Sequence, residues 1–257
     1  MNYLVKTNDI STLTDVGYNR IVYDSTTGFV YCKGANVNAY VDLGLPSQLK
    51  WAKWNIGAKS EEEPGLYFQW GDTQGYTAEQ VGDGEGLKAF SYADYKWGSP
   101  SNFSRYNASD KKTVLDPEDD AAHVIMGGNW RMPTLKDYKE LFSNTDIYLV
   151  PTEGEEIQVT PQEHGEGVMI NWASQLNGSL KGIKFYKQNN KQTYMFVPFA
   201  GYADRGSVRK SVGYVWASSL DSSNVQTAWS FGFGQLSGIL GSINRNNGLP
   251  VRGVLAQ

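Results

Sequence analysis

Four acidic side chains stand close together in residues 115–124, whose sequence is LDPEDDAAHV. Calcium prefers clustered oxygen ligands, so Asp116, Glu118, Asp119 and Asp120 are candidate ligands of a calcium ion. The same residues also suit the start of a helix, with Asp116 as N-cap, a proline at the first helical position and acids at the positive end of the helix dipole. We favour the capping interpretation, because each residue type already stands where capping requires it.

Two histidines and one cysteine are the other residues with obvious catalytic or metal-binding potential. His123 and His164 each lack further ligands at a metal-binding spacing, and Cys32 lies far from both in the sequence. The chain contains no G-x-S-x-G elbow, no phosphate-binding loop and no dinucleotide fingerprint. We therefore expect a protein without catalytic residues or a cofactor, in which the histidines have structural roles and Arg131 pairs with a carboxylate or with carbonyl groups.

Composition excludes several classes of partner. The 257 residues carry a net charge of −4, and no basic run is longer than Lys111-Lys112, so we expect no nucleic-acid partner. No stretch approaches the roughly 18 apolar residues of a membrane span. The first residues lack the basic start and apolar run of a secretory signal, which favours synthesis in a cytoplasm without membrane insertion.

Local patterns predict two helices and a short N-terminal hairpin. Ile21–Tyr23 and Phe29–Tyr31 are β-prone runs separated by a turn sequence, and we expect residues 1–38 to form an anchor or docking segment. The acidic cluster starts the first helix, which Gly127 and Gly128 end. In the second, Thr134 followed by Asp137 resembles a capping box, and apolar residues at positions 135, 138, 141 and 142 share one helical face.

Beyond residue 144 the patterns favour strands. We expect a hairpin in residues 183–202 that turns at 188–191, and further strands in GYVWASS (213–219), TAWSFGF (227–233) and LPVRGVL (249–255). Residues 151–182 are polar and glycine-rich, and no element is assigned to them. After Phe233 the chain alternates small, polar and aliphatic residues, which is equally consistent with a ligand-recognising loop and with an ordinary surface loop.

Six blocks of the sequence, taken in order, resemble the Fibrobacter succinogenes major paralogous domain family of gut Bacteroidota and their phages. The resemblance covers roughly residues 39–257 and implies an α+β, C-type-lectin-like domain with two helices, small twisted antiparallel sheets and long loops. Residues 145–182 look longer than is typical, which predicts an inserted loop or subdomain there. The blocks are YVDLGLPSQLKWAKWNIGA, GLYFQWGDT, LDPEDDAAHVIMGGNWRMPTLKDYKEL, FVPFAGY, GYVWASSLD and NRNNGLPVRGV.

Two activities of related folds do not transfer to this chain. Formylglycine-generating enzymes depend on a pair of cysteines, and calcium-dependent lectins carry Glu-Pro-Asn or Gln-Pro-Asp; neither occurs here. Some C-type-lectin-like proteins of phages and bacteria are varied by diversity-generating retroelements in their C-terminal loop region. The resemblance therefore implies an exposed ligand-binding set that consists of Trp229, Ser230, Gln235, Leu236, Ile239, Ser242, Asn244, Asn246 and Asn247.

The expected function is that of a non-enzymatic binding module. It would be a tail or head fibre adhesin of a phage virion that contacts a glycan or protein on the host surface. Residues 1–38 would join it to other virion proteins, and a homo-oligomer, preferably a trimer, would present it. The alternatives are a bacterial cell-surface protein whose signal sequence is absent here and, less favoured, a divergent enzyme.

Overall fold

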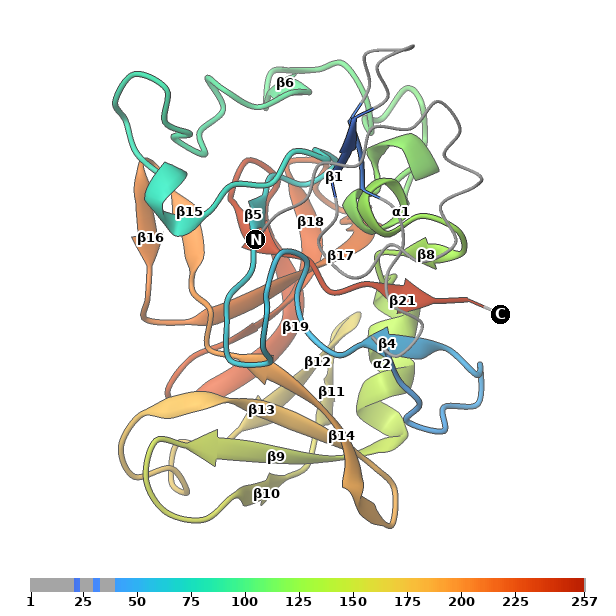
Figure 1. Cartoon of the computed structure of the whole chain (residues 1–257), viewed down its shortest axis with the longest axis vertical. Helices are drawn as coiled ribbons and strands as arrows, with labels where there is room; N and C mark the ends of the chain where they lie inside the picture. The colour runs from blue at the N-terminus through green and yellow to red at the C-terminus, as the bar shows by residue number, and fades with distance from the viewer. Residues whose placement is uncertain (1–20, 24–29, 33–39, 257) are drawn as a thin grey trace.

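The computed structural model describes residues 21–23, 30–32 and 40–256, and its fold is α+β (Figure 1). Within these residues the chain forms two α-helices and a series of small sheets in which every named strand pair is antiparallel. None of the described helices is long and apolar enough to cross a membrane.

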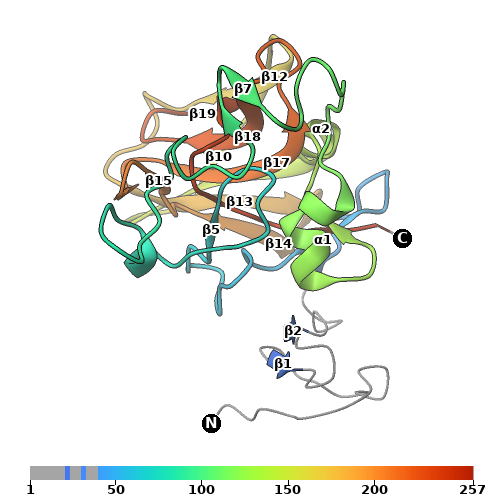
Figure 2. The same ribbon diagram turned by 90° about the horizontal axis from the view of Figure 1, so that it is seen from above.

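Two larger sheets and one helix enclose the main core. The four-stranded sheet and the five-stranded sheet lie on either side of buried apolar side chains, with helix α2 (Leu135–Ser143) at one end (Figures 1 and 2). In spatial order the four-stranded sheet consists of β10 (Ile157–Val159), β9 (Thr145–Pro151), β13 (Leu180–Lys187) and β14 (Asn190–Pro198). The five-stranded sheet consists of β11 (Gln162–His164), β12 (Gly167–Asn171), β19 (Ser237–Asn244), β18 (Thr227–Phe233) and β17 (Gly213–Leu220).

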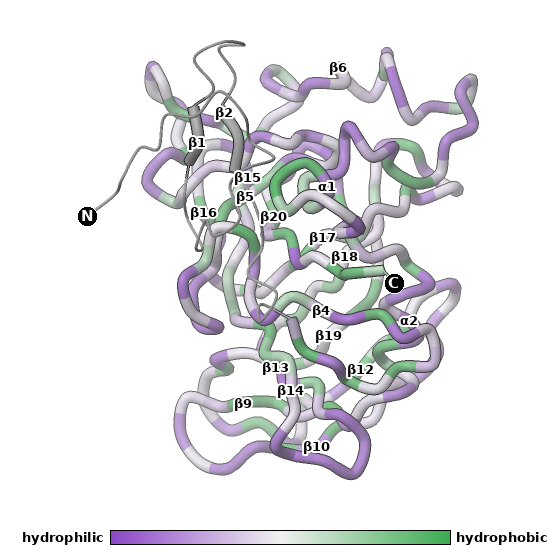
Figure 3. The backbone as a smooth tube through the Cα atoms, turned by 45° about the vertical axis from the view of Figure 1, so that its right-hand side comes forward, coloured by the Kyte–Doolittle hydropathy of each residue, from purple (hydrophilic) through white to green (hydrophobic). Residues whose placement is uncertain are grey.

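Short elements build the rest of the molecule. Figure 3 shows hydrophobic segments within the sheets and hydrophilic segments in many of the peripheral loops. A second four-stranded sheet has the order β3 (Tyr40–Val41), β4 (Lys50–Ala52), β21 (Val254–Leu255) and β8 (Trp130–Arg131). The remaining elements are β1 (Ile21–Tyr23) with β2 (Val30–Cys32), β5 (Tyr67–Phe68) with β20 (Leu249–Pro250), β6 (Gly98–Ser99) with β7 (Asn102–Phe103), β15 (Tyr202–Asp204) with β16 (Ser207–Arg209), α1 (Ala121–Met126), and 3-10 turns η2 (Ala78–Gln80) and η3 (Pro117–Asp119).

The second predicted helix is confirmed together with its cap. Thr134 and Asp137 exchange side-chain and backbone hydrogen bonds at the start of α2, which satisfies amide groups that have no partner inside the helix. Tyr138, Leu141 and Phe142 are buried on the face that the spacing predicted.

The prediction of one continuous first helix is wrong. A 3-10 turn, η3, ends at Asp119, and α1 begins only after Asp120. The carboxylate of Asp120 accepts hydrogen bonds from the backbone N–H groups of Ala122 and His123, and also from Met132 N–H at 2.8 Å. Asp120 is therefore the N-cap of α1, whereas the side chain of Asp116 makes no capping bond.

The strand predictions hold for three segments and fail for one. The hairpin β13–β14 turns at Gln188 and Asn189, and residues 213–219 and 227–233 are strands. Residues 249–255 instead form two short strands in different sheets, because the chain crosses from β5 to β4 and β8 around Arg252. Residues 145–182, for which an inserted loop or a subdomain was expected, supply β9 to β12 and the start of β13, so the loop alternative is wrong. The N-terminal hairpin is present as β1 and β2, while the rest of residues 1–38 lies outside the described residues.

Two fully buried arginines hold the loops to the sheets. Arg245 follows β19 and donates to the carbonyl oxygens of Tyr106 at 2.7 Å, Val225 at 2.9 Å and Arg105 at 3.1 Å. Its guanidinium also lies 4.0 Å from the ring centroid of Phe103. Since the guanidinium has five N–H donors, one side chain satisfies several carbonyl groups that sheet ladders do not reach.

Arg252, between β20 and β21, has the same role nearer the end of the chain. Its guanidinium donates to Asn55 Oδ1 at 2.9 Å and to the carbonyl oxygens of Ala52, Lys53 and Phe196. Phe196 lies in β14, whereas the other three acceptors lie in or after β4. Arg252 thus ties the second four-stranded sheet to the edge of the first.

We predict that Arg245→Met lowers the free energy of unfolding by about 3 kcal/mol or more, because buried carbonyl groups without a donor cost about 1–3 kcal/mol each. Urea unfolding followed by tryptophan fluorescence measures the change. Arg209→Met is the matched control, since Arg209 is exposed and makes only a 3.7 Å pair with Asp204; its expected change is within about 0.5 kcal/mol. Equal stability of the two variants would contradict the role of Arg245.

Candidate functional site

The two faces of the five-stranded sheet differ in what covers them. Successive residues of a strand point to opposite faces. In β18 the aromatic residues Trp229, Phe231 and Phe233 point inward to the main core, so Ser230 and Gly232 belong to the outer face. The outer face is the one that could meet another molecule.

One half of the outer face is covered by the chain itself. Trp216 of β17, Ala228 of β18 and Ile243 of β19 belong to a second core cluster, built with residues from the loops before α2. Trp216 is fully buried, and its indole N–H donates to the carbonyl oxygen of Phe68 at 2.7 Å. This end of the sheet is therefore closed to a partner.

Within the part of the chain that the structure describes, the other half of the outer face is open. The strand register places Tyr214, Gly232, Ile239, Met169 and Gln162 opposite one another in a line that crosses all five strands. Ile239 is 39% exposed, Gln162 is exposed, and Met169 and Tyr214 are half-buried. We call the surface formed by Ile239, Met169 and Gln162, together with the neighbouring exposed residues Gln235 and Leu236 of the β18–β19 turn, the open sheet face; Tyr214 stands at its margin, where it packs against the second core cluster.

Trp172 holds the β18–β19 turn in place through two hydrogen bonds. Its indole N–H donates to the carbonyl oxygen of Gln235 at 3.0 Å, and its backbone N–H donates to that of Leu236 at 3.0 Å. The ring also lies against Gly238, where an added Cβ would approach a Trp172 ring carbon to 2.9 Å. Leu236, 63% exposed, is thereby presented on a backbone held at both turn carbonyls.

Glycine keeps the centre of the open sheet face flat. A Cβ at Gly232 would lie 2.2 Å from the ring of Tyr214, so the ring lies over this glycine. The Tyr214 ring also makes an edge contact with the ring of Tyr202, at a centroid distance of 5.2 Å. Burial raises the pKa of the Tyr214 hydroxyl, and the neighbouring Tyr202 adds to the shift.

Four residues of the predicted ligand-binding set are buried, which corrects the sequence-based expectation. Trp229 faces the main core, because it shares the inward side of β18 with two phenylalanines. Ser230 points outward but lies under the second core cluster and is 2% exposed. Asn246 and Asn247 form the buried turn after β19, in which Asn246 donates to the carbonyl oxygen of Phe90 at 3.1 Å.

The other five predicted residues are exposed, but the fold separates them into two groups. Gln235, Leu236 and Ile239 lie on the open sheet face. Ser242 and Asn244 lie at the opposite end of β19, where Ser242 donates to the carboxylate of Asp221 at 2.7 Å. Sequence reasoning missed Met169, Gln162 and Tyr214, since only the strand pairing brings these distant positions beside Ile239.

The acidic cluster is neutralised by basic side chains of the chain itself. One ligand atom from each of Asp116, Glu118 and Asp119 falls within 4.8 Å of the others, the spacing of a metal site. Arg105 forms ion pairs with all three carboxylates, at 2.7 Å for Glu118 and 3.0 Å for Asp119. Its guanidinium thus supplies the positive charge that an ion would otherwise bring.

Further contacts complete this network. Lys112 pairs with Asp116, and Lys96 lies 3.0 Å from Asp119, which also accepts a hydrogen bond from the Tyr106 hydroxyl at 2.7 Å. Hydrogen bonds from Lys112 and Arg105 lower the pKa of Asp116, and Arg105 lowers that of Glu118. Burial, by contrast, raises the pKa of Asp120 despite its three backbone N–H donors.

His123 and Arg131 make contacts within the chain, whereas the structural role expected of His164 stays a prediction. His123 Nδ1 lies 3.1 Å from the carbonyl oxygen of Trp130, and His164 is exposed in the edge strand β11. Arg131 forms a 2.6 Å ion pair with Asp137 and donates to the carbonyl oxygen of Met132, as the sequence predicted.

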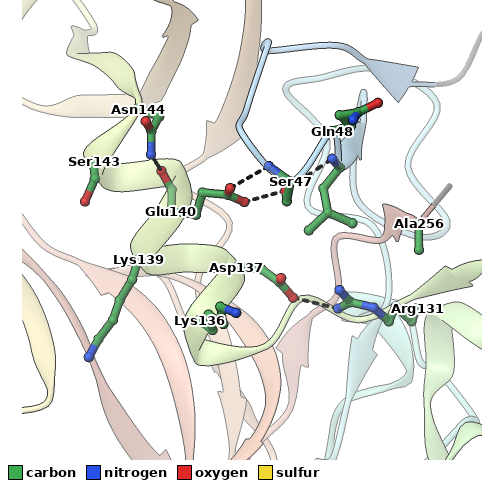
Figure 4. Close-up of a pocket in the computed structure, with 11 residues that line it drawn as sticks. Ser47, Gln48, Arg131, Lys136, Asp137, Lys139, Glu140, Ser143, Asn144 and Ala256 are labelled. Atoms are coloured by element: carbon green, nitrogen blue, oxygen red, sulfur yellow. Dashed lines mark hydrogen bonds and ion pairs between the residues drawn. The ribbon is translucent and has the colours of Figure 1, made fainter.

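A polar hollow of about 790 Å³ lies between α2 and the loop before β4 (Figure 4). Its two carboxylates already have partners: Asp137 binds Arg131, and Glu140 accepts from the Ser47 backbone N–H at 2.8 Å and from the Ser47 hydroxyl. The hollow is lined by Ser47, Gln48, Leu49, Arg131, Lys136, Asp137, Lys139, Glu140, Ser143, Asn144 and Ala256. We regard it as secondary to the open sheet face, because both of its acids are engaged within the chain, Glu140 by Ser47 and Asp137 by Arg131.

Comparison with known proteins gives no match: no family model, no curated protein and no solved structure is significantly similar to the chain. The resemblance described from the sequence blocks therefore stays a prediction.

We predict that calcium does not stabilise the folded protein, because Arg105 already neutralises the acidic cluster. Thermal unfolding in millimolar calcium and in EDTA is expected to give the same Tm. A calcium-dependent rise in Tm would show that the folded state binds the ion and would contradict this assignment.

The ion pairs of Asp116 and Glu118 also predict that the folded protein is less stable in acid. Because the pKa values of Asp116 and Glu118 are lower in the folded than in the unfolded chain, the unfolded chain binds more protons in acid. The stabilisation is present above the unfolded pKa values, near about 4, and is lost as the pH falls below them. Urea unfolding against pH is expected to show this loss, and Arg105→Gln to reduce it. An unchanged pH profile in Arg105→Gln would contradict the prediction.

Proposed function

We propose that this protein is a non-catalytic binding module that contacts its ligand through the open sheet face. The observation that carries the proposal is the position of Leu236 and Ile239. These two large apolar side chains are exposed three residues apart on one hairpin, and half-buried Met169 lies opposite Ile239 in the adjacent strand. Exposed apolar side chains that gather on a surface mark interaction sites more often than single exposed ones do.

The rigid support of the hairpin is consistent with a recognition surface. Trp172 holds the turn through two backbone carbonyl groups, so the exposed side chains lose little backbone freedom when a ligand binds. Binding costs less free energy when the contacting groups are already ordered. An irregular, unsupported loop would lack this advantage.

The wider setting that we propose comes from the sequence resemblance. It is that of a C-type-lectin-like adhesin on a phage virion, in the tail or head fibre, that contacts a protein or glycan on a host cell. Residues 1–38 would attach it to other virion proteins, and several copies, preferably three, would raise avidity. A bacterial cell-surface interaction protein is the alternative, and a signal peptide encoded upstream of Met1 would favour it.

We predict that Leu236→Ser combined with Ile239→Ser weakens saturable binding of the full-length protein to intact gut Bacteroidota cells by about tenfold or more, or about 1.4 kcal/mol. Flow cytometry with labelled protein measures the change. Leu87→Ser is the matched control, since Leu87 is 45% exposed in a distant loop, and it is expected to bind as the unchanged protein does. Equal binding of the double variant would contradict the open sheet face as the site.

A further inference from the structure

We infer that Asn177 is a site of spontaneous deamidation, at which the side-chain amide is converted to aspartate or isoaspartate. The inference is independent of the proposed binding function. It rests on a comparison of the two places where glycine follows asparagine in the sequence, Asn177-Gly178 and Asn247-Gly248. The first pair is exposed, whereas the second is held inside the molecule.

The reaction of an Asn-Gly pair needs no partner other than water. The backbone nitrogen that follows the asparagine loses its proton and attacks the side-chain Cγ. A five-membered succinimide ring closes, and the amide group leaves with a proton as ammonia. Water then opens the ring at either carbonyl, which gives aspartate or an isoaspartate whose backbone runs through the side-chain carbons. Glycine favours the closure, because it has no Cβ to obstruct the attacking nitrogen and it allows many backbone conformations.

The loop around Asn177 meets these requirements. Asn177 and Gly178 lie between β12 and β13, and both are exposed. Neither forms a hydrogen bond with a described residue, so no described contact holds the attacking nitrogen or the side-chain amide in place. An added Cβ at Gly178 would meet nothing within 4 Å, which shows that the site has open space for the rearrangement.

The second pair lies in a turn that blocks the same reaction. Asn247 is 5% exposed, and its backbone N–H donates to the carbonyl oxygen of Asn244 at 3.1 Å. The N–H of Gly248, which would have to attack, donates to the carbonyl oxygen of Ala203 at 2.8 Å. An added Cβ at Gly248 would approach a ring carbon of Phe90 to 2.2 Å, so the glycine lies against this ring. The succinimide can therefore close there only when the region unfolds locally.

Conversion at position 177 changes both the charge and the length of the loop. Leu176 packs against the main core, and the carbonyl oxygen of Ser179 accepts a hydrogen bond from the Thr152 N–H at 2.8 Å. An isoaspartate between these two attachments adds a methylene group to the backbone, and either product adds a negative charge. Converted molecules therefore form a more acidic species, which ion-exchange chromatography separates from the unconverted protein.

The test is incubation of the folded, full-length protein in mildly alkaline buffer, with peptide mapping by mass spectrometry at intervals. Isoaspartate is identified by labelling with protein isoaspartyl methyltransferase. We expect Asn177 to convert at least about tenfold faster than Asn247, because the buried pair reacts only through local opening. In urea at a concentration that unfolds the protein, we expect the two pairs to convert at similar rates.

Two variants locate the reaction. Asn177→Gln is expected to abolish the acidic species, since glutamine would have to form a six-membered ring, which closes far more slowly. Asn102→Gln is the matched control, because Asn102 is exposed but precedes Phe103, and it is expected to leave the acidic species unchanged. Equal conversion of the two Asn-Gly pairs in the folded protein, or no conversion of Asn177, would overturn the inference. An acidic species that forms as fast in Asn177→Gln would overturn it as well.

Discussion

The burial of two arginine side chains in the last part of the chain is the constraint on which the rest of the structure depends. Arg245 and Arg252 are shielded from water, and their guanidinium groups donate to backbone carbonyl oxygens of segments that no sheet joins. A buried guanidinium costs free energy unless its donors are satisfied, and unpaired loop carbonyls cost free energy as well. Each group therefore compensates the other, and the long loops before α2 acquire fixed positions.

Those fixed loops determine which part of the five-stranded sheet remains accessible. Trp70 and Tyr106 from the loops pack with Trp216 of β17 over one half of the outer face. Arg245 lies in the same region and holds the chain at Tyr106 and at Val225, close to β18. The other half of the face, around Ile239, receives no such cover from the residues that the structure describes. The candidate site is therefore the part of the outer face of the five-stranded sheet that the second core cluster, with the loops held by the buried arginines, leaves exposed.

Mutual compensation of charged groups likewise explains the acidic cluster. Its carboxylates are close enough to hold a metal ion, yet Arg105, Lys96 and Lys112 surround them. Asp120, adjacent in sequence, is separate from this network: its carboxylate caps α1 and binds Met132 N–H across the turn to β8. Acids that look equivalent in the sequence therefore perform two structural tasks, pairing with basic side chains and capping a helix.

The sequence by itself determined the elements whose signals are local. The Thr134–Asp137 cap, the buried face of α2, the β13–β14 turn and the strand in residues 227–233 all depend on residues a few positions apart. Tertiary structure decided everything that depends on distant pairing. It buried Trp229 and Asn246 and placed Met169 and Tyr214 in line with Ile239. The reason is that strand alternation fixes two faces, while only the packing of other segments decides which face, and how much of it, meets water.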